Sequence, residues 1–280
     1  MLFDAGNLIS NHPDNKGLRA AWIDLPGSSG VRMTNRLNGQ FHLLPTNSPS
    51  KSATPFGKGA FRLASASSQF MRSTSPVVTQ LPVAVCAWVY TFSNHNGTIW
   101  DCRRSSGGFT GFSISPRSNG AVRWYQNGGT QRFVSTSAGV LPIATWTRVS
   151  GFAVSATDYR VYINGVKVLT GTSNTGTTFS SVTVTNIGRY EAGGGSGEYF
   201  NGLIGDVWVW GGSDFFQNDP DAFMARDYQY SQRLETDPRI RSSTKRYYTA
   251  GGGGGGQPTI ARLSGTPGAR LGGSSFGRGW

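Results

Sequence analysis

The sequence predicts an all-β protein, built as an antiparallel two-sheet sandwich with a short C-terminal helix and an extended glycine-rich tail. Short runs of alternating apolar and polar residues follow one another from Pro82 onward, separated by the turn pairs Asn96-Gly97, Asn119-Gly120, Asn127-Gly128 and Asn164-Gly165. Many short strands with regular turns are typical of sandwiches. The chain has 16 Phe, 10 Tyr and 8 Trp, too many for disorder throughout, so we expect its 40 glycines to serve turns around a buried core.

The elements follow in order along 280 residues. Residues 1–16 are polar and read as an N-terminal arm, 17–26 as a first strand ended by Pro26-Gly27, and 27–58 as a loop-rich stretch; the run 57–63 resembles the next strand of the family described below. Further strands are expected at 83–91, 98–103, 109–115, 121–126, 131–136, 146–154, 159–169, 182–188 and 203–210. These form a sandwich domain over 17–212, followed by a helix-containing extension over 213–246 and the tail over 247–280.

A helix is expected from about 220 to 232. Asp219 is a good N-cap residue and Pro220 suits the first helical position, where no backbone donor is needed.

The best local signal is a tight hairpin at Asn164-Gly165. This pair lies between two β-rich runs, 159–163 and 166–169, and supplies the two positive-φ residues of a type I′ turn. Together with Trp146 and Val149 upstream, the run YRVYINGVKV resembles the central signature of laminin G-like domains of the concanavalin A-like lectin/glucanase superfamily.

Other segments extend this resemblance over roughly 17–212. They are the opening G-L-x-x-x-W at 17–22, Asn186-Ile187-Gly188-Arg189, and the closing run 199–210. The resemblance implies a jelly-roll sandwich. The chain departs from the family pattern at Arg148, where a histidine often follows the Trp, and at Gly205, where an acid often precedes the Asp.

Calcium, which some family members bind, stays an alternative because no pair of acids occupies the ligand positions. Asp101, Asp158 and Asp206 are isolated carboxylates, which we expect in turns or at the surface. No metal and no cofactor is expected.

The charge is strongly one-sided, with 26 Lys and Arg against 14 Asp and Glu, a net +12. Such a surface favours anionic partners, whether nucleic acid, phosphorylated glycans or an acidic protein surface. The bases are scattered and form no basic arm, so nucleic acid is not the expected partner. The N-terminus carries no export signal and no stretch is long and apolar enough to cross a bilayer, so neither secretion nor a membrane location is expected.

Catalysis is not expected. A glycosidase on this fold needs two carboxylates on one face, yet none of the three glutamates, Glu191, Glu198 and Glu235, shares a strand with another acid at i+2. The histidines His12 and His42, together with His95, lie in predicted arms or loops, with no G-x-S-x-G motif nearby. We therefore predict a non-enzymatic protein, with a degenerate glycosidase as a third reading.

An aromatic face is predicted on one sheet. Along 83–90 and 206–210 the valines point one way, which we expect to be the core, and Trp88, Trp208 and Trp210 point to the outer, concave side. Exposed, these rings would bind sugars or a protein partner; covered by an arm, they would form a second small core, which we favour. Trp124 and Tyr125, on the strand 121–126, are further candidate contacts.

The two cysteines, Cys86 and Cys102, flank the turn Asn96-Gly97. If 85–91 and 98–103 pair as a hairpin, they face each other and could bond. Two reduced, buried thiols are the favoured alternative for a protein made in the cytoplasm.

The C-terminal region 238–280 contains seven bases, no acid and six consecutive glycines. A laminin G-like domain with such a tail is similar to virion proteins of tailed bacteriophages. This resemblance implies a capsid decoration or tail/fibre accessory protein, assembled in the host cytoplasm, forming a homo-oligomer and docking on major capsid or tail subunits. The expected docking residues are Arg262, Arg270, Phe276, Arg278 and Trp280. The alternative function is a carbohydrate-binding module that attaches the particle to glycans.

Overall fold

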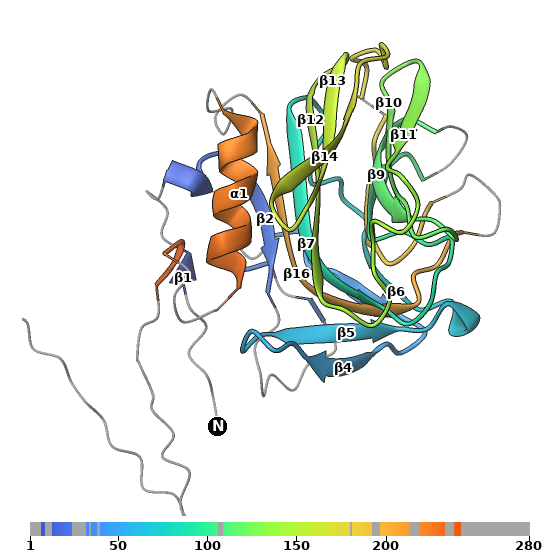
Figure 1. Cartoon of the computed structure of the whole chain (residues 1–280), viewed down its shortest axis with the longest axis vertical. Coiled ribbons are helices and arrows are strands. Elements are labelled where there is room, and N and C mark those ends of the chain that lie inside the picture. The colour runs from blue at the N-terminus through green and yellow to red at the C-terminus, as the bar shows by residue number, and fades with distance from the viewer. Residues whose placement is uncertain are drawn as a thin grey trace, which may run out of the picture.

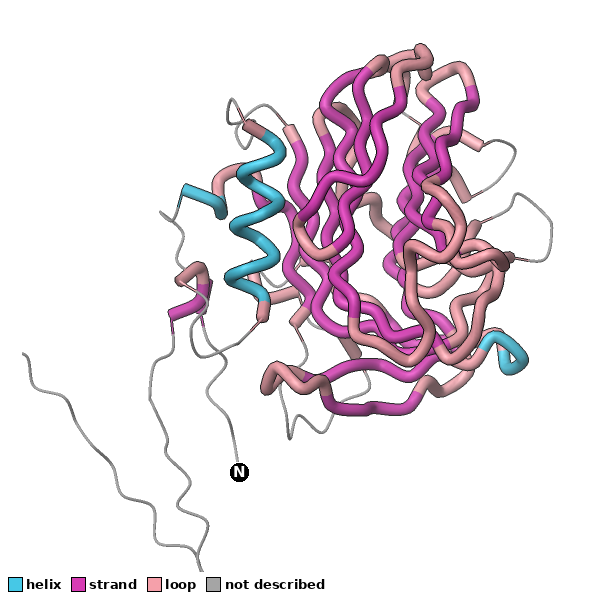
Figure 2. The backbone as a smooth tube through the Cα atoms, in the orientation of Figure 1, coloured by secondary structure: helices cyan, strands magenta, loops and turns pink. Residues whose placement is uncertain are grey.

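The fold is a two-layer β-sandwich with one α-helix on its outer side (Figure 1, Figure 2). The structure is a computed structural model that describes residues 7–8, 13–23, 32–33, 35–37, 40–105, 109–179, 181–191, 197–212, 219–232 and 238–241. All pairs between the named strands are antiparallel. The predicted all-β sandwich is confirmed. No described helix is long and apolar enough to cross a membrane.

The first sheet has seven strands. In spatial order they are β11 (Gln131–Ser135), β10 (Val122–Asn127), β9 (Gly111–Pro116), β8 (Trp100–Arg103), β15 (Val184–Ile187), β6 (Phe70–Ser73) and β3 (Leu44–Thr46).

The second sheet has eight strands. Seven of them run in the order β14 (Val166–Gly171), β13 (Asp158–Ile163), β12 (Thr147–Ser155), β7 (Val83–Thr91), β16 (Gly202–Gly211), β5 (Gly59–Leu63) and β4 (Ser50–Ala53). The remaining strand, β2 (Leu18–Trp22), pairs with β16.

The main core lies between the sheets, where the predicted alternation holds. Val83, Val85 and Val89 of β7 are fully buried in it together with Val207 and Val209 of β16. The opposite side of these two strands carries the large aromatic rings, as the period of two requires.

The hairpin between β13 and β14 turns at Asn164-Gly165. Asn164 has φ 50° and Gly165 has φ 77°, so both central residues take the left-handed conformation, and the predicted type I′ turn is confirmed. The Asn164 side chain also accepts a hydrogen bond from the main-chain N–H of Arg148, which ties the turn to β12.

Helix α1 (Pro220–Ser231) lies against the outer side of the eight-stranded sheet (Figure 1). Its N-cap is Asp219, whose carboxylate accepts a hydrogen bond from the N–H of Ala222 at 3.0 Å, as the sequence predicts. Phe223 and Met224 face the sheet and are buried there. The short strand β1 (Asn7–Leu8) pairs with β17 (Ile240–Arg241) beside this helix, so the predicted N-terminal arm meets the extension after the helix. Two short 3₁₀ helices, η1 (Pro13–Asn15) and η2 (Ser65–Ser67), complete the described elements.

One arrangement that the sequence left open does not occur. The strands β7 and β8 do not form a hairpin: they belong to different sheets, because the chain crosses the sandwich between them. Cys86 and Cys102 are therefore separate free thiols, each buried in a different apolar cluster. Two short strands, β3 and β4, lie within the stretch 27–58 that was predicted to be loop-rich.

Candidate binding site

The predicted aromatic face is covered. Helix α1 and the N-terminal segment pack over Trp88, Trp208 and Trp210, which are at most 2% exposed. The indole N–H of Trp88 donates to the main-chain oxygen of Ser231 at the end of α1, and that of Trp210 donates to the main-chain oxygen of Asp14. Both acceptors belong to the covering segments, so these rings form the second core that was the favoured alternative and offer no platform for a sugar.

The other predicted contacts are buried too. Trp124 lies in the main core, and Tyr125 is 2% exposed with its hydroxyl donating to the main-chain oxygen of Phe109 at 2.6 Å. The predicted docking residues of the tail lie outside the described residues: Arg262, Arg270, Phe276, Arg278 and Trp280.

A surface that the sequence did not indicate lies on the outer side of the seven-stranded sheet. The residues of this sheet that point away from the core are mainly polar, and one row of cross-strand neighbours runs through Arg72, Asn186, Asp101, Ser113, Tyr125 and Phe133. A short ribbon crosses above this row, because 189–191 and 197–199 pair with each other.

Five arginines gather where the ribbon meets the sheet, and we call them the arginine face: Arg72, Arg103, Arg117, Arg123 and Arg189. Three carboxylates lie among them. Glu198 of the ribbon accepts from Arg117 and Arg123, and Glu191 accepts from Arg72, all at 2.9–3.2 Å. Arg103 pairs with Asp101 below the ribbon.

Aromatic rings alternate with these guanidinium groups. Arg103 lies 3.7 Å from the ring centroid of Tyr190 and 4.8 Å from that of Tyr125, and Arg123 lies 5.6 Å from that of Phe133. Phe133, on the edge strand β11, is 58% exposed. Flat apolar rings beside rigid hydrogen-bonding groups are what a sugar ring with its hydroxyls needs.

Several polar atoms of this surface lack partners. Nη1 and Nη2 of Arg103, Nε of Arg123 and Nε of Arg189 are buried and have no hydrogen-bond acceptor in the part of the chain that the structure describes. Burial, and next the like charge of Arg117, lowers the pKa of Arg123. Burial also raises the pKa of the Asp101 carboxyl to about 6, against the opposing effect of Arg103.

Asp101 and Asp206 do not lie where the sequence predicts. Both Asp101 and Asp206 are fully buried and ion-paired, not turn or surface residues. The N–H of Glu191 donates to Asp101 at 3.2 Å, so two acids from distant parts of the chain lie close together. Arginines hold both carboxylates, and the described residues contain no group of three or more metal-ligating side chains.

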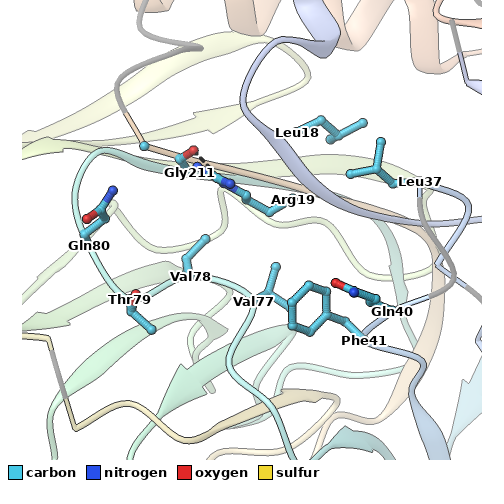
Figure 3. Close-up of a pocket in the computed structure, with 11 residues that line it drawn as sticks. Leu18, Arg19, Leu37, Gln40, Phe41, Val77, Val78, Thr79, Gln80 and Gly211 are labelled. Carbon is cyan, nitrogen blue, oxygen red and sulfur yellow. Dashed lines mark hydrogen bonds between the residues drawn. The ribbon is translucent and has the colours of Figure 1, made fainter. Parts of the chain in front are cut away.

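A separate hollow, of about 570 Å³ and away from the arginine face, opens where β2 and β16 meet the loop before β7 (Figure 3). Figure 3 shows Val77, Val78 and Phe41 on one side of it and Arg19 and Gly211 on the other. Among the described residues that line it, Arg19 alone is charged, and its Nε already donates to the Gly211 oxygen at 2.9 Å. The hollow is lined by both apolar and polar residues, but it holds a single charged side chain, whereas five guanidinium groups gather at the arginine face.

Two antiparallel sheets with this strand order define a sandwich of the jelly-roll type. A family model described as the concanavalin A-like lectin/glucanases superfamily, of laminin G type, matches residues 65–213. The match spans more than half of the chain, and the chain therefore belongs to this superfamily. The resemblance to laminin G-like domains of this superfamily, which the sequence predicts, is confirmed over the matched residues.

Solved structures support the same fold. Domain 4 of AbnA, an extracellular arabinanase from Geobacillus stearothermophilus solved in complex with arabinotriose, is 17% identical with a TM-score of 0.53, and the alignment covers 76% of this chain and 98% of that one. The binding domain of Paraclostridial Mosquitocidal Protein 1 is 10% identical with a TM-score of 0.55, covering 78% of this chain and 52% of that one. No curated protein matches the chain.

Proposed function

We propose that the chain is a non-catalytic glycan-binding domain whose site is the arginine face and the rings beside it. The observation that carries this proposal is the pairing of Phe133, a largely exposed ring on the edge strand, with the partly exposed guanidinium of Arg123 at 5.6 Å. One can stack on a sugar ring while the other donates hydrogen bonds to its hydroxyls. The two solved structures named above are a domain in complex with arabinotriose and the binding domain of a mosquitocidal protein, and both support a binding role.

The proposal excludes hydrolysis for a chemical reason. A general acid must reach the leaving oxygen and give up its proton, but Asp101 is completely buried and its two oxygens accept from Arg103 and from the N–H of Glu191. Glu191 is itself held by Arg72 and Asn186. Incubation with a glycan panel should release no reducing ends above a heat-inactivated sample.

The chain offers a matched control for the binding site. Phe92, at the end of β7 on the other sheet, is 38% exposed and has the guanidinium of Arg62 5.2 Å from its ring centroid. On a glycan array, Phe133→Ala should lose the signals that the unchanged protein gives, whereas Phe92→Ala should keep them. Equal loss in both variants, or no signal from the unchanged protein, would contradict the proposal.

A second candidate function is a structural virion component that docks on capsid or tail subunits in a particle assembled in the host cytoplasm. Its support is the composition of 238–280, which has seven bases and no acid and is suited to meeting acidic subunit surfaces. Deleting 247–280 tests it: the shortened protein should keep its melting temperature and its glycan binding but fail to join the particle. Normal incorporation after the deletion would refute the docking role.

A further inference from the structure

The arginine face holds more positive than negative charge. Its five guanidinium groups share three carboxylates, and one of the three, Asp101, is used up by the buried Arg103. This leaves four partly exposed arginines for two glutamates, Glu191 and Glu198. The arginine face thus carries an excess of two positive charges, which a bound anion would neutralise.

The existing ion pairs leave donors open. Arg117 and Arg123 each reach Glu198 through a single terminal nitrogen, Nη1 and Nη2 respectively, and Arg72 reaches Glu191 through Nη1. A guanidinium carries five N–H donors, so most donors of these three side chains have no acceptor among the described residues. Their side chains are between 19% and 29% exposed, which makes them accessible to a ligand.

Resting on the glycan-binding function proposed above, we infer that this site selects acidic sugars. A carboxylate or sulfate group of the sugar meets the guanidinium groups of Arg117 and Arg123, and the sugar ring stacks on Phe133. The geometry favours a sugar over a nucleic acid, because the open donors of Arg117 and Arg123 gather around the single carboxylate of Glu198, beside Phe133, whereas a nucleic acid needs a row of bases along its phosphate backbone.

The test compares each acidic sugar with its neutral counterpart, so that shape stays the same and only the charge changes. Titration calorimetry at 150 mM salt would use trigalacturonate and its methyl ester, 3′-sialyllactose and its methyl ester, and a sulfated disaccharide and its desulfated form. At least one acidic member should bind about tenfold more tightly than its neutral counterpart. Neutral members binding equally well would overturn this inference and leave glycan binding intact, whereas no binding of any sugar would overturn both.

Variants separate the local site from the overall charge. Arg123→Gln and Arg117→Gln should each weaken the acidic sugar about tenfold and its neutral counterpart by a smaller factor, because only the acidic sugar loses a charge partner. Arg62→Gln removes the same charge beside Phe92 on the other sheet and should change neither. Circular dichroism melting of each variant shows that it is folded. An equal loss with Arg62→Gln would assign the effect to net charge, and tighter binding of a single-stranded oligonucleotide that depends on Arg123 would assign the site to nucleic acid; either result overturns the inference.

Discussion

The guanidinium of Arg148, on β12, donates two hydrogen bonds to the carboxylate of Asp227, on helix α1, at 2.8 and 3.0 Å. Arg239 donates a third to the same carboxylate at 2.7 Å, and all three side chains are essentially without solvent contact. Burial alone would raise the pKa of Asp227, but the two guanidinium charges hold it well below its usual range. This triad fixes the helix over the aromatic rings of the sheet.

Replacing Asp227 by Ala should therefore destabilise the protein by about 3–5 kcal/mol, because two buried guanidinium groups lose the carboxylate that they share and Arg148 keeps only its longer contact with Asp206 at 3.5 Å. Urea unfolding at neutral pH measures the loss. Asp158→Ala is the control, since the Asp158–Arg160 pair is partly exposed and should contribute less than about 1 kcal/mol. Equal losses in the two variants would mean that the triad does not hold the helix.

The buried Asp101 should make stability fall as the pH rises. Its carboxyl keeps its proton up to about pH 6 in the folded chain but only to about 3.8 in the unfolded one, so ionisation between these values penalises the folded state. The penalty amounts to roughly 3 kcal/mol at neutral pH, at about 1.4 kcal/mol per pKa unit. Relative to Asp101→Asn, the unchanged protein should lose stability between pH 4 and 7. A difference that stays constant over this range would place the pKa of Asp101 at its unfolded value.

Gly165 should tolerate a side chain worse than Gly139 does. Both have φ near +75°, so alanine suffers the same backbone strain at each, about 1 kcal/mol. At Gly165 a Cβ atom would also lie 2.8 Å from Cβ of Tyr228 on α1, whereas at Gly139 nothing lies within 4 Å. Thermal unfolding should show Gly165→Ala as the less stable variant by a further 1–3 kcal/mol or so. If both variants melt together, the helix does not press on this turn.

The sequence predicted what depends on neighbours along the chain. The strands β7 and β16 and the turn at Asn164-Gly165 follow from alternation and from the φ preference of two residues, which local chemistry decides. The helix follows from its cap at Asp219 for the same reason. The hairpin considered around Asn96-Gly97 does not form, because a turn signal does not determine which sheet the next strand joins.

The binding site could not be predicted in the same way. Arg72, Arg103 and Arg123 stand on three separate strands. The partners of Arg72 and Arg123 are Glu191 and Glu198 of the ribbon, which are far away in the sequence. Arg103 pairs with Asp101, two residues before it on the same strand. No spacing in the sequence links them. The one available signal was Tyr125, whose outward position next to Phe133 on the neighbouring strand follows from the alternation of 121–126 once the strand pairing is known.

Substituting Trp208 and substituting Phe133 should have opposite effects on stability and on glycan binding. This comparison distinguishes the aromatic face predicted from the sequence, on the eight-stranded sheet, from the site proposed on the seven-stranded sheet. Trp208 is fully buried, stacked on Trp210 at 6.0 Å and covered by Arg239 at 4.2 Å, so Trp208→Ala should cost about 3–5 kcal/mol of stability. Phe133 is largely exposed, and Phe133→Ala should cost less than about 1 kcal/mol.

Binding should show the reverse order. With the folded fraction measured by circular dichroism, Trp208→Ala should bind glycans with unchanged affinity per folded molecule, because α1 lies between that ring and solvent. Phe133→Ala should stay folded and lose about tenfold or more in affinity, since a hot-spot ring contributes upwards of 1–2 kcal/mol. Loss of affinity in folded Trp208→Ala together with full affinity in Phe133→Ala would return the site to the eight-stranded sheet, and would require α1 to move away before a ligand binds.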